Sequence, residues 1–258
     1  MKQIIFPTEL HRIATTTITD VFAHQEHVDT ILLVNSLARG KGTPESDIDI
    51  VILVKEKTSE TMVAEMDFAW QQFLQSDTSL HNYISSNRFA QVHLDIIDGT
   101  FQPAPWEDGG AIDFFEVEIG NRVLYSAALT NEGGHLKKLK EKWLPYYNTH
   151  LRNERLQLCK EACNYDLDHL TFFVKRGLYF QAFDRLYITF QRFLQALFIS
   201  HHTYPIAYNK WIKEQVSEIL KLPELYDELP EIISVNNIES HELISKAQLL
   251  QGLIDEYC

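Results

Sequence analysis

Two hydrophobic runs separated by a short polar turn constrain this chain more than any other feature. The runs occupy residues 28–34 and 48–54, and Asp47 and Asp49 lie at the start of the second run. Burying a carboxylate in an apolar strand is costly unless the charge is paired or binds a metal. Residues two apart on a strand point to the same face, so the two carboxylates project together while the alternate isoleucines enter the core. The segment therefore predicts a strand that carries a metal site.

The remaining pattern changes character along the chain. Residues 1–130 mix strand and helix patterns, whereas glycine nearly vanishes after residue 131 and apolar residues recur at helical spacing. We therefore expect the α+β class, with a mixed sheet flanked by helices in 1–130 and an all-helical bundle in 131–258. The expected strands are 28–34, 48–54 and 87–97, and residues 112–118 and 121–125 are expected to form a further strand or a hairpin around Gly120. The expected helices are 8–24, 36–39, 58–75, 135–147, 150–176, 178–202, 208–221, 224–233 and 239–257.

Composition narrows the classes of partner. The 258 residues carry a formal net charge of -13, which argues against a nucleic-acid binder because such proteins need a basic face. An acidic protein better suits a neutral or cationic small molecule. The start of the chain lacks the apolar stretch of a signal peptide, and no segment has the length and apolarity of a membrane span. We expect a soluble, cytoplasmic protein without a zinc site, since the three cysteines lack metal-binding spacing.

The turn between the two strands predicts a phosphate site. Ser36 and the backbone N–H groups at the start of a short helix can donate to an anion, and Gly40 and Gly42 permit unusual backbone angles. Ser36 could instead act only as a helix cap, and Arg39 could pair with an acid at a strand end. The turn and the two carboxylates together indicate a site for a metal–nucleotide.

A third carboxylate, Asp95, lies inside the apolar run of residues 90–97. If that strand neighbours 48–54, Asp95 adds a third ligand to the metal site or serves as a general base. The alternative is a structural acid paired with His93 or Arg88. Both readings remain open at the level of the sequence.

These motifs resemble the nucleotidyltransferase signature of the DNA polymerase β superfamily. The signature is a Gly-Ser turn followed by Ser-Asp-φ-Asp-φ on the next strand, where φ is apolar. Here it is matched by Ser36-Leu-Ala-Arg-Gly40 and by Ser46-Asp47-Ile-Asp49-Ile, and the similarity covers roughly residues 10–125. The helical second half is more loosely similar to small-molecule nucleotidyltransferases of the antibiotic-adenylylating type.

The resemblance implies an activity. A hydroxyl of a small-molecule acceptor, an antibiotic being one candidate, would attack the α-phosphorus of ATP or another nucleoside triphosphate, releasing pyrophosphate. It implies that Asp47 and Asp49 bind Mg²⁺ and that Asp95 is a third ligand or the base. Ser36 would contact the terminal phosphates. The residues implied to bind the nucleotide with it are Asn35, Arg39, Ser46, Lys210 and Arg192, although Lys210 could equally be a solvated surface residue.

One position departs from the family pattern, since Asn35 replaces the usual glycine. Asparagine is the residue after glycine that best tolerates a left-handed backbone, so we expect the turn to form. Its side chain would lie beside the phosphates, which favours a second hypothesis, a non-catalytic regulator of the antitoxin-like kind. A protein-modifying adenylyltransferase is a third option. The acceptor, the nucleotide base and the choice between monomer and homodimer are not readable from the sequence.

Overall fold

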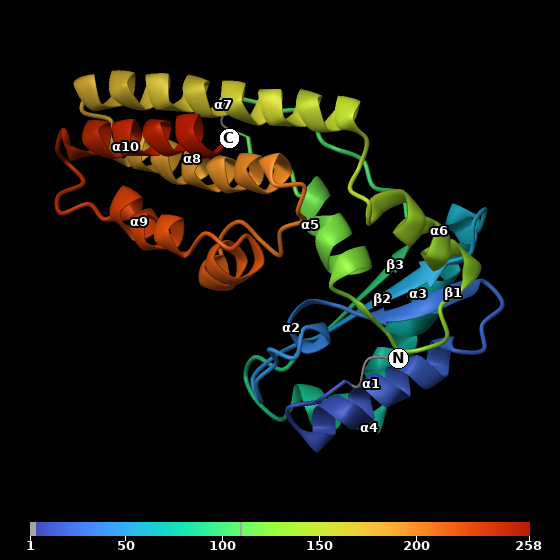
Figure 1. Ribbon diagram of the computed structural model, residues 1–258. Helices are drawn as coiled ribbons and strands as arrows, with labels where there is room; N and C mark the ends of the chain where they lie inside the picture. Colours follow the sequence, from blue (N-terminus) through green and yellow to red (C-terminus); the bar gives the residue numbers. More distant parts are fainter. Residues whose placement is uncertain (1–3, 109) are drawn as a thin grey trace. The chain divides into compact units, whose positions relative to one another are not determined.

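The described part of the chain, residues 4–108 and 110–258, forms two compact units in the computed structural model (Figure 1). Unit 1 comprises Met1–Phe101 and Glu118–Pro145, and unit 2 comprises Gln102–Val117 and Tyr146–Cys258. This division differs from the boundary expected after residue 130. The reason is packing, because Ile112 and Val117 are buried in the hydrophobic core of unit 2.

Unit 1 is built on a four-stranded mixed sheet with the order β3-β2-β1-β4. β1 runs antiparallel to both β2 and β4, while β2 and β3 are parallel. The sheet and the helices that surround it confirm the α+β class. The strands are β1 (Val28–Leu33), β2 (Ile48–Val54), β3 (Val92–Ile97) and β4 (Ala127–Ala128).

One face of this sheet carries the core of unit 1. Ile48, Ile50 and Ile52 of β2 are buried there in one cluster with residues of α1, α3 and α4. Thr8 caps α1 by accepting from the His11 N–H, as the sequence pattern of a helix start predicts. The short α4 was not expected, because its sequence carries few apolar residues. The helices are α1 (Glu9–Phe22), α2 (Asn35–Ala38), α3 (Glu60–Ser76), α4 (Thr78–Ile84) and α6 (Gly134–Trp143).

The prediction of a further strand or a hairpin around Gly120 is wrong. The segment is helical instead, with α5 (Phe115–Ile119) followed by a π-helical turn, η1 (Gly120–Leu124). Alternating apolar residues in 115–119 imitate a strand, but Phe115, Ile119 and Val123 are all buried. Their spacing of four residues puts them on one side of a helix, and this tertiary packing decides the structure.

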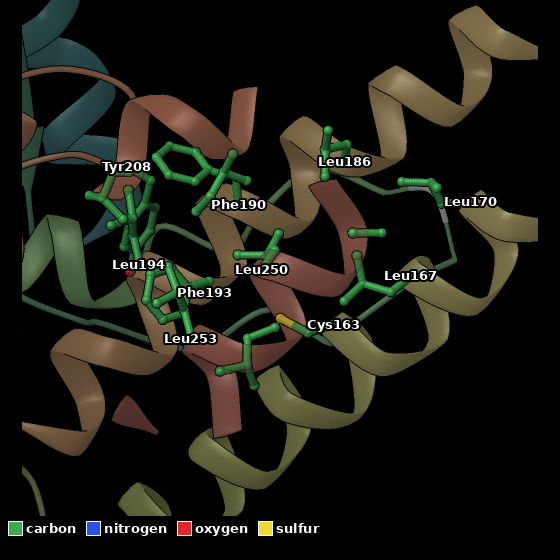
Figure 2. Close-up of a cluster of buried hydrophobic side chains, with 14 of the residues drawn as sticks. Cys163, Leu167, Leu170, Leu186, Phe190, Phe193, Leu194, Tyr208, Leu250 and Leu253 are labelled. Atoms are coloured by element: carbon green, nitrogen blue, oxygen red, sulfur yellow. The ribbon is translucent and has the colours of Figure 1, made fainter. Parts of the chain in front are cut away.

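Unit 2 is a helical bundle. α7 (Thr149–Lys175), α8 (Tyr179–Ser200) and α10 (Glu242–Tyr257) pack together, and α9 (Pro223–Ile233) completes the unit. Figure 2 shows the core they enclose, in which Phe193 and Leu250 are fully buried. Among the described residues, no helix combines the length and apolarity needed to cross a membrane.

The helix expected at 208–221 is shorter than predicted. Regular structure is limited to a π-helical turn, η2 (Glu214–Ile219), which follows two helical residues. Trp211 adopts a left-handed backbone with φ of 60°, and the carbonyl of Lys210 accepts from the Gln215 side chain at 2.9 Å. These two features prevent a helix from starting earlier.

Candidate functional site

Two carboxylates and one imidazole meet at the start of β2. Asp47 precedes the strand and Asp49 lies within it, and both point away from the face that buries Ile48 and Ile50. The parallel register pairs Asp49 with His93 of β3. The ligand atoms of Asp47, Asp49 and His93 lie within 4.8 Å of one another, and His93 Nε2 is 3.6 Å from Asp47 Oδ2. This donor set is suited to a divalent cation.

Asp95 lies apart from this group. The register places it opposite Val51, two residues further along the sheet than the Asp49–His93 pair. Its Oδ2 accepts from Arg122 Nη2 at 3.1 Å, and Arg122 also lies 3.8 Å from Glu118. Within the described residues, the close group of potential metal ligands contains His93 and does not contain Asp95. A metal-binding role for Asp95 stays a prediction.

Asp95 instead borders an open groove of about 650 Å³ within unit 1. The groove runs between α3 and β3, with Val63, Leu94 and Ile96 among its apolar lining. Its carboxylates are those of Glu60, Asp67, Asp95 and Asp98, and Arg122 is a cation beside them. A groove of this volume and charge can accept a small molecule that is neutral or positively charged.

The turn between β1 and β2 has the backbone that the family pattern requires. Asn35 has φ of 56°, in the left-handed region that glycine would adopt without strain. Ser36 follows in α2, and its carbonyl accepts from the Lys41 N–H at 2.9 Å. Gly40 reverses the chain with φ of 72°, and Gly42 passes so close to Leu37 that a side chain there would collide with it. Asparagine thus preserves the turn, as predicted.

Buried groups on the opposite side of β2 hold the peptide before Asp47. The carbonyl of Ser46 accepts from Tyr83 Oη at 2.7 Å and from His11 Nε2 at 3.0 Å. Because a carbonyl only accepts, His11 carries its proton on Nε2, and its Nδ1 accepts from the Thr8 hydroxyl at 2.8 Å. Burial and the charges of Asp47 and Asp49 raise the pKa of Tyr83, which keeps its phenol protonated as a donor.

The remaining predicted nucleotide-binding residues have varied surroundings. The Ser46 hydroxyl accepts from the Thr43 N–H at 2.9 Å and so shapes the turn, while Arg39 forms the C-cap of α2. In unit 2, Arg192 is buried, forms an ion pair with Asp166 and donates to the Gly110 carbonyl at 3.1 Å. Lys210 is exposed and precedes η2. A role in nucleotide binding stays a prediction for each of them.

Residues 16–98 match the family model described as polymerase beta, nucleotidyltransferase. This segment is a nucleotidyltransferase domain of the DNA polymerase β superfamily. The match contains the turn, Asp47, Asp49, His93 and Asp95, and it ends before Arg122 and before all of unit 2. The search of curated proteins found no match to the chain. Nucleotidyl transfer is therefore supported as the general activity, whereas the type of acceptor is not.

Sequence reasoning missed several residues that shape the nucleotidyltransferase domain. His93 and Asp95 are two residues apart on one strand and therefore point to the same face. Only the register shows which of them is level with Asp49. His11 lies on the buried stripe of α1, where a polar residue among apolar ones is a signal for a specific partner. Tyr83 and Arg122 offered no comparable signal, since both depend on contacts distant in sequence.

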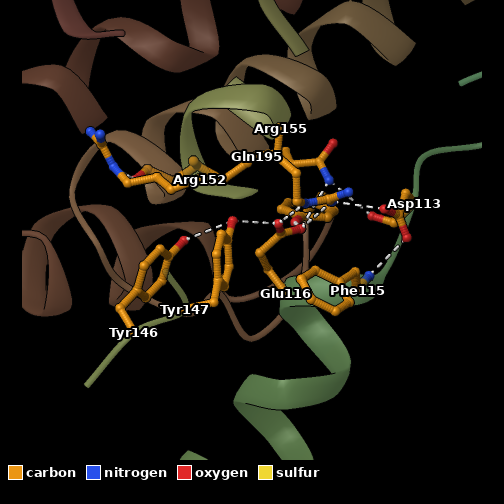
Figure 3. A network of polar contacts seen from close by, with 10 residues as sticks. Asp113, Phe115, Glu116, Tyr146, Tyr147, Arg152, Arg155 and Gln195 are labelled. Atoms are coloured by element: carbon orange, nitrogen blue, oxygen red, sulfur yellow. Dashed lines mark hydrogen bonds and ion pairs between the residues drawn. The ribbon is translucent and has the colours of Figure 1, made fainter. Parts of the chain in front are cut away.

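Unit 2 contains a second polar cluster, which is buried and saturated with internal partners (Figure 3). Glu116 accepts from Arg155 Nη2 at 2.8 Å, from Tyr147 at 2.9 Å and from Gln195 at 3.0 Å. Arg155 also pairs with Asp113 at 2.7 Å. Burial lowers the pKa of Arg155, but the hydrogen bonds and charge of Glu116 outweigh it and the pKa is raised. The cluster holds its charges in place without any further ligand.

Proposed function

We propose that the chain is a divalent-metal-dependent nucleotidyltransferase that moves a nucleoside monophosphate, AMP from ATP by default, to a hydroxyl of a small acceptor. The observation that carries the proposal is the convergence of Asp47, Asp49 and His93 beside the turn of Asn35 and Ser36. Carboxylates and imidazole are metal ligands, and the turn offers donors to phosphates.

The reaction joins an acceptor oxygen to the α-phosphorus. As the new P–O bond forms, the bond to pyrophosphate breaks and the acceptor hydroxyl loses its proton. A bound divalent cation would neutralise phosphate charge during this displacement. Asp47 and Asp49 would hold that cation at the strand start, and Ser36 would orient the terminal phosphates.

Asp95 is the proposed general base for the acceptor hydroxyl. The sequence left it two roles, and its ion pair with Arg122 and its place beside the groove favour the second. Its side chain is 61% exposed and borders the acidic groove, where an acceptor would lie. Arg122 would orient the carboxylate, and the groove's charge would favour a neutral or cationic acceptor over nucleic acid.

A non-catalytic regulator is the less favoured reading. It draws support from the Asn35 side chain, which would lie beside the phosphates, whereas the left-handed backbone at residue 35 is the one that the catalytic turn requires. A regulator of this fold would associate tightly with a partner protein and would bind no metal–nucleotide.

Pyrophosphate release tests the proposal. The purified chain is incubated with each of the four nucleoside triphosphates, a divalent cation and a panel of hydroxylated acceptors, alongside a thermal-shift series with the same nucleotides. We expect one nucleotide to stabilise the fold only when the metal is present, and one acceptor class to release pyrophosphate. Absence of metal-dependent nucleotide binding, with Asp47→Asn behaving like the parent chain, would contradict the proposal.

A further inference from the structure

We propose that the metal site of this domain is a mixed oxygen–nitrogen site, in which His93 ligates the ion beside Asp47 and Asp49, and that it therefore prefers a first-row transition-metal ion such as Mn²⁺ over Mg²⁺. The inference rests on the proposed function, because it concerns the same site. It departs from the all-carboxylate site that the sequence predicts.

The register of the sheet brings the imidazole to the metal position. β2 and β3 are parallel, and Asp49 pairs directly with His93, so their side chains emerge on one face at one level. The candidate ligand atoms lie within 4.8 Å of one another. Two donors bound to one ion at ~2.1 Å lie at most ~4.2 Å apart, so small rotamer adjustments of these half-exposed side chains complete the shell.

Asp95 does not compete for this position. It lies opposite Val51, about 6.6 Å further along the strand if each residue rises by ~3.3 Å. Asp47 and Asp49 have the same two-residue spacing, so the partner of the Asp95 carboxylate decides its role rather than this distance. Its carboxylate is also held by Arg122 at 3.1 Å. A cation would have to break that ion pair to recruit Asp95, whereas His93 Nε2 lies 3.6 Å from Asp47 Oδ2, within the group of potential ligands itself.

The chemistry of the third donor sets the metal preference. Mg²⁺ favours oxygen ligands in near-ideal octahedral geometry and keeps several waters. Imidazole binds first-row transition ions more strongly, and affinity at a mixed oxygen–nitrogen site rises along the series from Mn²⁺ to Cu²⁺. The neutral imidazole also leaves the site with one negative charge fewer than three carboxylates would supply.

Ion binding to the whole chain tests this directly. Metal-stripped protein is titrated with Mn²⁺ alone, with free ion followed by electron paramagnetic resonance, and then with Mg²⁺ as competitor. Pulsed measurements on the bound Mn²⁺ look for coupling to a ¹⁴N nucleus of imidazole. We expect that coupling in the parent chain and its loss in His93→Ala.

The variants then separate the contribution of the nitrogen. His93→Ala is expected to weaken Mn²⁺ binding by at least about 10–100-fold, because loss of a group that only supports a metal ligand already costs that much. Its effect on Mg²⁺ should stay below about threefold because oxygen donors dominate there. His93→Asp should move the preference toward Mg²⁺. His24→Ala, an exposed histidine at the end of α1, is the matched control and should change neither affinity.

The outcomes distinguish the inference from the function on which it rests. If Mn²⁺ binds without nitrogen coupling and His93→Ala leaves the Mn²⁺ to Mg²⁺ ratio unchanged, the inference is wrong, while metal-dependent nucleotidyl transfer still stands. If neither ion binds and no nucleotide stabilises the fold, the proposed function and the inference both fail.

Discussion

The two polar clusters of this chain differ in how far their carboxylates are buried and in how many internal partners those carboxylates have. In unit 2, Glu116 is fully buried and its carboxylate is saturated by an arginine, a tyrosine and a glutamine. In unit 1, the side chain of Asp47 is 44% exposed and has a histidine 3.6 Å away. A saturated buried carboxylate has no capacity left for a ligand, whereas a half-exposed one level with other donors has. The carboxylate of the first cluster is used up by internal partners, and the second cluster keeps donor atoms accessible.

The hydrogen-bond donors that support the two clusters also differ in what they contact. Around Glu116 the partners contact the charge itself. Behind Asp47 the buried donors His11 and Tyr83 contact only the preceding backbone carbonyl, so the strand start is held while the carboxylate stays accessible. Positioning through the backbone leaves the functional atoms open, which is the arrangement a preorganised site needs.

Removing the charge of the unit 2 cluster should produce the largest change in stability. Glu116→Ala leaves the buried Arg155 with Asp113 as its one ion-pair partner among the described residues, and breaking a buried ion pair in this way costs about 3–5 kcal/mol. Urea unfolding of the full chain measures the loss. Glu56→Gln, which disrupts the exposed pair with Lys138, is the control and should change little. A loss no greater than that of the control would mean that the cluster is not structural.

Removing a carboxylate from unit 1 should instead affect chemistry and leave the fold intact. Asp49→Asn retains the shape of the side chain but lowers its affinity for a cation. We expect pyrophosphate release to fall by about 10²–10³-fold, because metal stabilisation of phosphate charge is worth several kcal/mol. The control is Asp20→Asn, which changes an exposed acid of α1. The rates of the two variants are compared after their melting temperatures have been shown to be equal. Equal rates for the two variants would remove Asp49 from the mechanism.

The donors behind the strand should give an intermediate effect. Tyr83→Phe removes the 2.7 Å hydrogen bond to the Ser46 carbonyl and should cost about 1–2 kcal/mol of unfolding free energy. Because the carbonyl also anchors Asp47, Mn²⁺ affinity should weaken in the same variant. Tyr187→Phe in α8 is the control for loss of a phenol hydroxyl. Lower stability with unchanged metal affinity would limit Tyr83 to a packing role.

The comparison also explains what the sequence could predict. Strands β1 and β2, the left-handed turn at Asn35 and the convergence of Asp47 with Asp49 follow from local rules of alternation and backbone preference. The partner of those carboxylates does not, because it depends on the β2–β3 register, and a shift of two residues separates His93 from Asp95. The segment 112–125 was misread for a related reason, since Phe115, Ile119 and Val123 are buried by packing that alternation alone does not reveal.

The smallest expected effect concerns the turn that both hypotheses of function share. At φ of 56°, residue 35 favours glycine or asparagine and disfavours other side chains. Asn35→Gly relieves backbone strain but gives the unfolded chain more freedom, so the two effects should cancel to within about 0.5 kcal/mol. Asn35→Ala also removes the amide, but alanine tolerates the left-handed backbone poorly. This variant should therefore lose about 1–2 kcal/mol of unfolding free energy.

Both variants lack the amide of Asn35. The difference between their unfolding free energies in denaturant therefore measures the cost of the left-handed backbone at residue 35, separately from the loss of the side chain. Nucleotide binding to Asn35→Gly then reports whether the asparagine obstructs the phosphates. If binding stays within about threefold of the parent chain, a free-energy difference of ~0.7 kcal/mol, the substitution is neutral for an enzyme. If alanine proves as stable as glycine, the turn is not left-handed in solution, and the phosphate donors that depend on it are misplaced.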